Sequence, residues 1–474
     1  MNRVAVPEPA SNRGIYANRT LNLRSIRAIG YDMDYTLVHY RVVEWEERAF
    51  EHARTRLGAA GWPVASLEFD PTQVVRGLTI DRELGNMVKA TRFGYVISAA
   101  HGTRFLDYDE TRSAYAATIV DLAESRFEFL NTLFSLSEAS LYAQLVDVLD
   151  SGGLPGVGYS ELYAAVRGAI SDSHQEDQLK GEILADPGRF IDLDPDNVLA
   201  LQDQQAAGKR LLLVTNATWE YAREIMAYSF DQFLPDGTGW RDLFDSVIVS
   251  AAKPGFFTGT NPLFRVVDED AGVLHPHRGG LEPGGVFFGG NAAVVEESLG
   301  LSGDEILYVG DHLFGDVHIS KAYLRWRTAL ILRELESEVD ALIDFQPDQR
   351  RLESFMAEKV ELEAELGALR LVLQRRREGY APPPVEIEDA AGALDEVRKE
   401  LAELDDAVAP LAGASGRLRH EAWGPLMRAG LDKSLFARQV ERYADVYTSR
   451  VSNFLYPGPF ALLRASRLDL PHDP

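Results

Sequence analysis

Apolar runs of strand length alternate with amphipathic segments through the second half of this chain. Four such runs follow one another from about residue 195, namely 211–216, 245–250, 305–311 and 327–332. Segments with helical periodicity, such as 219–228, lie between them. This alternation is typical of a parallel sheet whose two faces are covered by helices.

A fifth apolar run, 26–31, reads as a buried strand of the same sheet, although more than a hundred residues separate it from the others. We therefore predict an α/β fold whose Rossmann-like parallel core, 25–45 and 190–345, is interrupted by a mixed α/β cap, 46–189. The cap would sit above the carboxyl ends of the strands, where ligands bind in open α/β sheets.

Helical periodicity predicts further elements outside the core strands. Inside the insertion it predicts helices at 45–57, 117–134 and 138–149. Apolar stripes at heptad-like spacing predict a helical hairpin at 346–410, broken at 379–384. We expect residues 1–24 to form an extended arm, and residues 411–474 to dock on the core or form an oligomer contact.

Composition excludes several classes of function. The chain has 474 residues and a net charge of −25, which disfavours binding to nucleic acid polymers and anionic membranes. It contains no cysteine, so disulfides, thiolate metal sites and cysteine nucleophiles are excluded. Residues 1–22 lack the apolar core of a signal peptide, and no run is long enough to span a membrane. The expected location is therefore cytoplasmic.

Two aspartates, Asp32 and Asp34, follow the first predicted strand. Neighbouring carboxylates repel each other, so they stay ionised at low cost only beside a metal ion or a strong cation. Their oxygens suit Mg²⁺, which binds one or two carboxylates and leaves positions for phosphate oxygens. Taken alone, the pair reads equally well as a solvated acidic turn.

Polar residues also follow the other predicted strands: Thr215 with Asn216, Lys253, and Asp311 with Asp316. Taken singly, these read as helix caps or turns. Because the carboxyl ends of parallel strands meet in one crevice, the complete set predicts a phosphoryl-transfer site. Carboxylates there would hold Mg²⁺, a lysine and a hydroxyl would hold phosphate oxygens, and one carboxylate would attack phosphorus.

These residues resemble the four motifs of the haloacid dehalogenase superfamily, through Asp32-Met-Asp-Tyr-Thr36, Thr215-Asn216, Lys253 and Gly310-Asp-His-Leu-Phe-Gly-Asp316. More narrowly, the chain is similar to the cytosolic purine 5'-nucleotidase group. That similarity includes Leu130-Asn-Thr-Leu-Phe134, Trp326-Arg-Thr328 and the segment 435–445. The resemblance covers nearly the whole chain and is weakest at 350–410. Very many phosphatases share the first motif, whereas the form of the last motif, 310–316, is far more specific to this group.

The resemblance implies a role for each matching residue. Asp32 would be the nucleophile, and Asp34 would protonate the leaving oxygen and then activate water. Mg²⁺ would be held by Asp32, the backbone carbonyl of Asp34, and Asp311. Thr215 and Lys253 would bind the transferred phosphoryl group.

Other matching residues would support the site or bind substrate. Asp316 would orient the water shell of the ion or the lysine, and Asn216 would belong to the same supporting layer. Phe134 matches the aromatic residue on which the purine stacks in the family. Arg167 and Lys180 fall where the family contacts the base and nearby groups.

One departure from the family pattern concerns the base. Where the family has an aspartate four residues after the arginine, this chain has Ser171, followed by Asp172. Selectivity for a 6-oxopurine is therefore open.

A second departure concerns the family's effector-nucleotide site. Asn131, Phe314 and Arg327 match that site, but Asp121 and Ala322 stand where the family has basic residues. Because an anionic triphosphate gains nothing from an aspartate, we expect weak or absent activation by ATP-like effectors.

The leading hypothesis is a Mg²⁺-dependent 5'-nucleotidase that hydrolyses purine nucleoside 5'-monophosphates through an aspartyl-phosphate. Transfer of phosphate to a nucleoside needs only a nucleoside hydroxyl in place of water. One alternative is a phosphatase for another small phosphomonoester, and another is a non-catalytic scaffold that keeps the fold. The resemblance also suggests a homo-oligomer, either a dimer or a tetramer.

Overall fold

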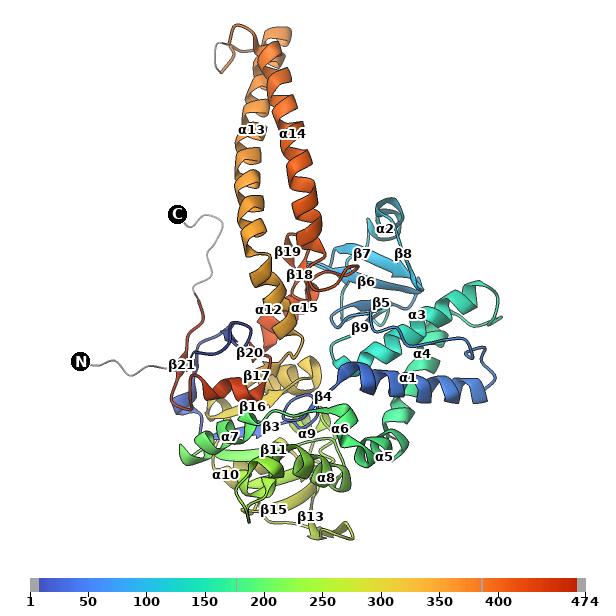
Figure 1. Ribbon diagram of the computed structural model, residues 1–474, viewed down its shortest axis with the longest axis vertical. Helices are drawn as coiled ribbons and strands as arrows, with labels where there is room; N and C mark the ends of the chain where they lie inside the picture. Colours follow the sequence, from blue (N-terminus) through green and yellow to red (C-terminus); the bar gives the residue numbers. More distant parts are fainter. Residues whose placement is uncertain (1–7, 176, 385–386, 467–474) are drawn as a thin grey trace, which may run out of the picture. The chain divides into compact units, whose positions relative to one another are not determined.

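The computed structural model describes residues 8–175, 177–384 and 387–466 (Figure 1). Its contacts divide the chain into two compact units. One unit consists of Met1–Glu336 and Leu426–Pro474, and the other of Ser337–Pro425. Every residue predicted to carry chemistry belongs to the first unit.

A ten-stranded sheet organises the first unit, with strands in the order β1-β20-β17-β16-β3-β11-β12-β15-β13-β14. The six strands from β17 to β15 run parallel to one another. They are β17 (Arg327–Ile331), β16 (Ile306–Gly310), β3 (Ala28–Tyr31), β11 (Arg210–Val214), β12 (Ser246–Val249) and β15 (Gly285–Gly289). The predicted α/β fold with a parallel sheet is therefore confirmed.

The central strands β3 and β16 are apolar throughout because both faces of the sheet are covered. Every residue of these two strands is buried, which is why they read as continuous rather than alternating apolar runs. The strands approach each other closely at Gly30. A Cβ atom there would lie 2.9 Å from Cδ2 of Tyr308, so a larger residue would have to displace that ring.

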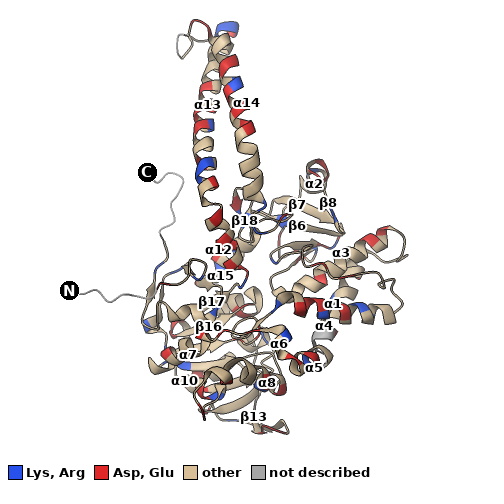
Figure 2. Cartoon of the chain, viewed as in Figure 1, with Lys and Arg blue, Asp and Glu red and all other residues tan. Residues whose placement is uncertain are grey.

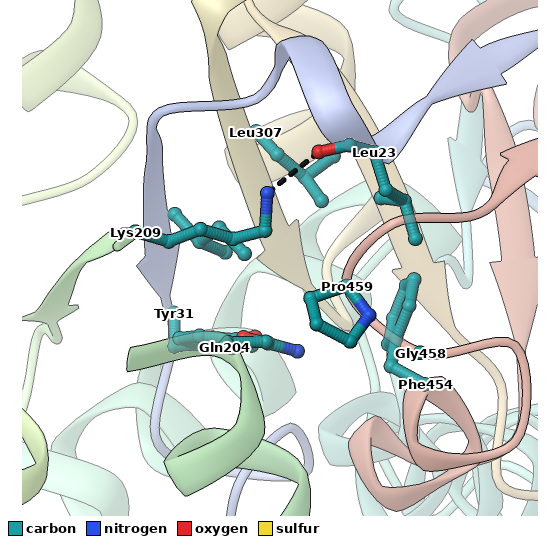
Figure 3. A pocket seen from close by; sticks show the side chains of 9 residues that line it. Leu23, Tyr31, Gln204, Lys209, Leu307, Phe454, Gly458 and Pro459 are labelled. Atoms are coloured by element: carbon teal, nitrogen blue, oxygen red, sulfur yellow. Dashed lines mark hydrogen bonds between the residues drawn. The ribbon is translucent and has the colours of Figure 1, made fainter. Parts of the chain in front are cut away.

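The two faces of the sheet differ in what covers them. An apolar cluster that includes Val214, Phe256 and Trp326 packs on one face. On the other face the Tyr31 hydroxyl donates to Gln204 of α7 (Asp196–Ala206). Nearby, the Lys209 ammonium donates to the Leu23 carbonyl at 2.6 Å (Figure 3). A cavity of about 10 Å³ remains there, room for about one water molecule.

Strands from distant parts of the chain complete the sheet at both edges. β20 (Val446–Thr448) lies parallel to β17, and β1 (Ile15–Ala17) pairs antiparallel with β20. At the opposite edge, β13 (Leu263–Asp268) and β14 (Val273–Pro276) add two antiparallel strands beyond β15. The segment that follows the second unit therefore returns to the same sheet.

The insertion after β3 contains helices and a separate antiparallel sheet. The helices that pack together are α1 (Val42–Ala59), α3 (Leu136–Asp150), α4 (Tyr159–Gln175) and α5 (Asp177–Ala185). The sheet has the order β8-β7-β6-β5-β9. Its strands are β8 (Arg104–Phe105), β7 (Val96–His101), β6 (Asn86–Ala90), β5 (Thr79–Asp81) and β9 (Phe127–Phe129).

The helix predicted at 117–134 is wrong. Helix α2 (Tyr108–Tyr115) ends before this segment, and the three residues of β9 lie in its second half. Asp121 accepts a hydrogen bond from the backbone N–H of Ala123 at 3.0 Å, a local turn that competes with helix formation. β9 pairs antiparallel with β5, so the two phenylalanines at its ends are buried on one side of a strand.

The second unit contains a helical hairpin, α13 (Gln346–Glu378) and α14 (Ala390–Gly416). Its buried core consists of Leu369, Val372, Ala390, Leu394 and Val397. Charged residues of both signs are spread along the two helices (Figure 2). Across the described parts of both units, we find no helix that combines the length and apolarity needed to cross a membrane.

Candidate functional site

The first candidate residues lie in the loop that follows β3. Asp32 is buried, and its Oδ1 accepts a hydrogen bond from the backbone N–H of Met33 at 2.8 Å. Asp34 Oδ1 accepts a hydrogen bond from the Tyr40 hydroxyl at 2.6 Å. Tyr35, the next residue, has a left-handed φ of 52°. Because this conformation costs a non-glycine residue about 1–2 kcal/mol, the surrounding packing must hold the loop in place.

Lys253 joins the aspartates that come from the first and last motifs. Its Nζ lies 2.7 Å from Asp32 Oδ1 and 2.9 Å from Asp316 Oδ1. The lysine side chain is 4% exposed, so solvent does little to screen these ion pairs. The structure thus brings together residues that are more than two hundred positions apart in sequence.

The backbone around Lys253 is held by the end of the neighbouring strand. Asn216 Oδ1 accepts from the Lys253 backbone N–H at 2.7 Å, and Asn216 Nδ2 donates to the Lys253 carbonyl at 3.1 Å. Ser250 and Ala252 have left-handed φ values of 46° and 57°. Asn216 therefore secures a loop whose conformation is unfavourable for its own residues.

Tyr308 is part of the site but was not singled out from the sequence. Its hydroxyl accepts a hydrogen bond from Lys253 Nζ at 3.0 Å and donates to the Val214 carbonyl at 3.1 Å. The signal available in the sequence is a single hydroxyl inside the otherwise apolar run 305–311. A buried tyrosine needs a hydrogen-bond partner, and here that partner is the ammonium group of the site.

Three buried carboxylates could hold a metal ion together. Among the described residues, Asp32, Asp311 and Asp316 offer oxygens that all lie within 4.8 Å of one another. An all-oxygen set of this kind fits Mg²⁺. The carboxylate of Asp34 does not belong to this set, because its Oδ1 accepts the hydrogen bond from Tyr40.

Burial dominates the electrostatics of these acids. It raises the pKa of Asp32 to about 6, helped by Asp316 and opposed by Lys253. It also raises the pKa of Asp34 to about 6, helped by the charge of Asp32. Burial lowers the pKa of Lys253, but Asp316 and Asp32 outweigh that effect and raise it well above its usual value. The lysine is therefore a permanent cation beside Asp32, a carboxyl group whose own pKa is raised.

Thr215 places a hydroxyl directly after the end of β11. The side chain is fully buried, and Oγ1 accepts a hydrogen bond from the Ala217 backbone N–H at 3.0 Å. Because the oxygen is used as an acceptor, its proton remains available for donation to a phosphoryl oxygen.

Arg76, also not anticipated from the sequence, connects the inserted region to the strand that carries Asp311. Its guanidinium donates to the backbone carbonyl of Asp311 and, at 2.9 Å, to that of Asn131. It also lies 3.6 Å from Glu334. An arginine in an irregular polar segment gives no sequence signal for these long-range contacts. Its cation lowers the pKa of Asp311, although burial prevails and leaves that pKa well above its usual value.

Aromatic side chains gather beside Asp34. Phe134 contacts Tyr35 edge-on, with ring centroids 4.7 Å apart, and Trp45 at 5.4 Å. Tyr40 contacts the same Tyr35 and Trp45 at 5.3 and 4.4 Å. Phe134 is only partly buried, so the cluster offers an aromatic surface next to the acidic loop.

The other predicted substrate residues lie on helices α4 and α5 of the insertion. The Lys180 ammonium lies 5.5 Å from the centre of the Tyr221 ring, and its charge acts on Asp34. Arg167 instead pairs with Glu128 at 2.7 Å and is half exposed. Ser171 is exposed on α4. Lys180 is thus the one of these three that the structure brings to the acidic loop.

The residues that match the effector-nucleotide site have partners within the chain. Asn131 Nδ2 donates to the Phe129 carbonyl at 3.3 Å, and Phe314 packs against the rings of Phe129 and Tyr443. Arg327 Nε lies 2.9 Å from Asp445 Oδ2. The two departures, Asp121 and Ala322, are both exposed.

Comparisons with known proteins find similar sequences over nearly the whole chain. A model of the 5' nucleotidase family matches residues 15–474. A 5'-nucleotidase domain-containing protein of Dictyostelium discoideum is 27% identical over 97% of this chain and 74% of its own length. 5'-nucleotidase domain-containing protein 2 of Rattus norvegicus is 29% identical, over 93% of this chain and 76% of its own. The Homo sapiens protein of that name is 27% identical, over 93% of this chain and 81% of its own length.

Proposed function

The chain belongs to the 5' nucleotidase family, and from that premise we propose that it is a Mg²⁺-dependent 5'-nucleotidase acting on purine nucleoside 5'-monophosphates. Membership makes it a phosphoric monoester hydrolase, in line with the names of its relatives. The proposal adds the substrate, the ion and the residues that carry the reaction.

The position of Lys253 between Asp32 and Asp316 is the observation that carries this proposal. An ammonium group beside the buried Asp32 carboxylate favours its ionised form, which leaves Asp32 able to attack phosphorus. A scaffold that kept only the fold would have no use for such a cluster, because buried charges cost stability unless they are paired.

The reaction follows from the placement of these groups. A carboxylate oxygen of Asp32 would form a bond to phosphorus while the bond from phosphorus to the nucleoside oxygen breaks. Asp34 would give that oxygen a proton. Water would then lose a proton to Asp34 and attack phosphorus, which breaks the bond to Asp32 and releases inorganic phosphate. Lys253 and Thr215 would bind the phosphoryl oxygens throughout.

Asp32, Asp311 and the backbone carbonyl of Asp34 would hold Mg²⁺, with Asp316 as a neighbouring acid that orients Lys253 or the water around the ion. When bound, the ion supplies positive charge that offsets the carboxylates and the phosphate. Support for this fit comes from the buried carboxylate oxygens of Asp32, Asp311 and Asp316, which lie within 4.8 Å of one another.

The substrate part of the proposal rests on the aromatic surface beside the acids. The purine would stack on Phe134, whose ring is braced by Tyr35 and Trp45. Lys180 would lie closest to the substrate among the predicted cap residues. Arg167 would have to leave Glu128 to reach a base, and Ser171 leaves the base preference open.

Several further properties belong to the same proposal. A nucleoside hydroxyl in place of water would make the protein a phosphotransferase. We propose a cytoplasmic homo-oligomer with weak or absent activation by ATP-like effectors, since Arg327 is already held by Asp445. The competing functions are a phosphatase for another small phosphomonoester and a scaffold without turnover.

Release of phosphate from a panel of monoesters tests the proposal. With Mg²⁺ present, kcat/KM for purine nucleoside 5'-monophosphates should exceed that for sugar phosphates by at least about tenfold. Removal of divalent ions with a chelator should abolish turnover. Equal rates on both substrate classes would reject the nucleotidase and favour a general phosphatase.

Asp32→Asn should reduce turnover by at least about a thousandfold, because the nucleophile is lost. The variant should remain folded, since Lys253 keeps its contact with Asp316. Asp270→Asn is the matched control, because the Asp270 side chain is fully exposed. Unchanged turnover in Asp32→Asn would contradict the mechanism.

A further inference from the structure

A chain of buried hydroxyl groups lies behind Asp34. The Tyr40 hydroxyl donates to Asp34 Oδ1 at 2.6 Å, and the Tyr221 hydroxyl lies 3.1 Å from that of Tyr40. Since the proton of Tyr40 is directed to Asp34, Tyr221 has to be the donor in the second contact. The Lys180 ammonium lies over the ring of Tyr221, at 5.5 Å from its centre.

Packing fixes the position of Tyr40 independently of any ligand. The residue lies on β4 (His39–Tyr40), where it pairs with Ile191 of β10 (Ile191–Asp192). Its ring contacts Tyr35 at 5.3 Å and Trp45 at 4.4 Å, and the residue is 3% exposed. Packing alone therefore holds the Tyr40 hydroxyl in place, and the hydroxyl constrains the orientation of the Asp34 carboxyl group that it contacts.

The hydrogen bond decides which oxygen of Asp34 can carry a proton. Oδ1 accepts from Tyr40, so a proton placed on that oxygen would face another donor. The proton of the neutral acid belongs on Oδ2, and the bond also fixes the rotation of the carboxyl plane. Both constraints, the proton on Oδ2 and the fixed carboxyl plane, help Asp34 to protonate one oxygen of the substrate, because proton transfer requires a short and aligned contact.

We propose that Tyr40, backed by Tyr221, is the positioning residue for the proton-donating carboxyl group of Asp34. This inference rests on the proposed function. As the bond from phosphorus to Asp32 forms and the bond to the nucleoside oxygen breaks, the proton on Asp34 Oδ2 passes to that oxygen. The water that later attacks phosphorus returns a proton to the same carboxylate, so no other reactant is needed.

Tyr40→Phe removes the hydroxyl, and a pair of substrates tests its role. One substrate is a purine nucleoside 5'-monophosphate, and the other is the same molecule with sulfur as the bridging 5' atom. A thiolate can leave without being protonated first. The reason is that a simple thiol, with a pKa of about 8.5, is a much stronger acid than the 5' hydroxyl of a nucleoside. We compare kcat/KM, which covers the steps up to formation of the aspartyl-phosphate.

Tyr40→Phe should lower kcat/KM for the oxygen substrate by about tenfold or more, while the sulfur substrate changes by less than about threefold. A merely structural role would lower both values by the same factor, and that result would overturn the inference. So would an unchanged value for the oxygen substrate.

Two further variants keep the test decisive if Tyr40→Phe folds poorly. Tyr221→Phe leaves the bond from Tyr40 to Asp34 in place and should cause a smaller loss of the same selective kind. Tyr31→Phe is the matched control, since it removes a buried hydroxyl that donates to Gln204 on one face of the sheet. It should affect both substrates equally.

The outcomes separate this inference from the function on which it rests. If the unaltered chain hydrolyses neither substrate, the proposed function fails. If the unaltered chain is active and Tyr40→Phe and Tyr221→Phe lose activity on both substrates in proportion, only the positioning role fails.

Discussion

At the scale of single residues, Glu46 is a buried carboxyl group that is not one of the candidate site residues. It is fully buried on α1, and its Oε2 accepts a hydrogen bond from the Ser137 backbone N–H at 2.7 Å. Its Oε1 has no hydrogen-bond partner among the described residues. Burial raises the pKa of Glu46 to about 8, so the group is a neutral acid at physiological pH.

This raised pKa makes the stability of the protein depend on pH. The pKa of Glu46 is higher in the folded state than in the unfolded chain. Its contribution to the free energy of unfolding is therefore fully present below about pH 4.5 and is lost as the pH rises through about 8. Glu46→Gln keeps a neutral group at all pH values. The variant should match the unaltered chain near pH 4.5 and be more stable above pH 8 by on the order of 2–4 kcal/mol.

Urea unfolding between pH 4.5 and pH 9 measures this difference. Glu47→Gln serves as the control, because Glu47 is the exposed neighbour on the same helix. Parallel stability profiles for the unaltered chain and Glu46→Gln would show that Glu46 does not titrate differently on folding.

At the scale of elements, local patterns predicted well those strands that are buried on both faces. β3 and β16 appear in the sequence as plain apolar runs because no polar side chain interrupts them. The segment 117–134 failed because Phe127 and Phe129 suit a strand, and only the pairing with β5 decides between strand and helix. β20 has three residues, and its place beside β17 depends on chain far away in sequence.

The candidate site likewise contains residues that the sequence could reveal and residues that it could not. Asp32, Lys253 and Asp316 could be found from the sequence because each follows a strand whose carboxyl end faces one crevice. Tyr308 and Arg76 could not, since their roles come from contacts with Lys253 and with the Asp311 carbonyl. A residue that acts through a tertiary contact leaves no periodic signal in the chain.

The hairpin of α13 and α14 has a core of its own, which makes its stability testable as an element. Leu369 is 1% exposed in that core, whereas Val360 on the same helix is 61% exposed. Leu369→Ala should destabilise the hairpin by about 2–5 kcal/mol, because it leaves a cavity. Val360→Ala should change its stability by less than about 0.5 kcal/mol.

Hydrogen exchange measures this effect locally. Amides of α13 and α14 should exchange faster in Leu369→Ala, while those of β3 and β16 in the other unit keep their protection. An equal loss of protection in both units would contradict the view that the hairpin unfolds separately.

At the scale of the whole molecule, Asp445 joins segments from both ends of the chain to the sheet. It is 1% exposed, and its carboxylate contacts Lys321 and, at 2.9 Å, Arg327. Its backbone carbonyl accepts from the N–H groups of Asn18 and Arg19, both at 2.9 Å. Burial would raise the pKa of Asp445, but the two cations outweigh burial and lower the pKa below its usual value.

Asp445→Asn should therefore destabilise the first unit by about 3–5 kcal/mol, because it leaves partly buried cations without their counter-charge. Asp270→Asn breaks an ion pair with Arg223, at 3.1 Å, in which the aspartate is fully exposed. That control should change stability by less than about 1 kcal/mol. Thermal unfolding of the three proteins measures both effects. If the two variants lost the same small amount of stability, Asp445 would not be the residue that ties the two ends of the chain to β17.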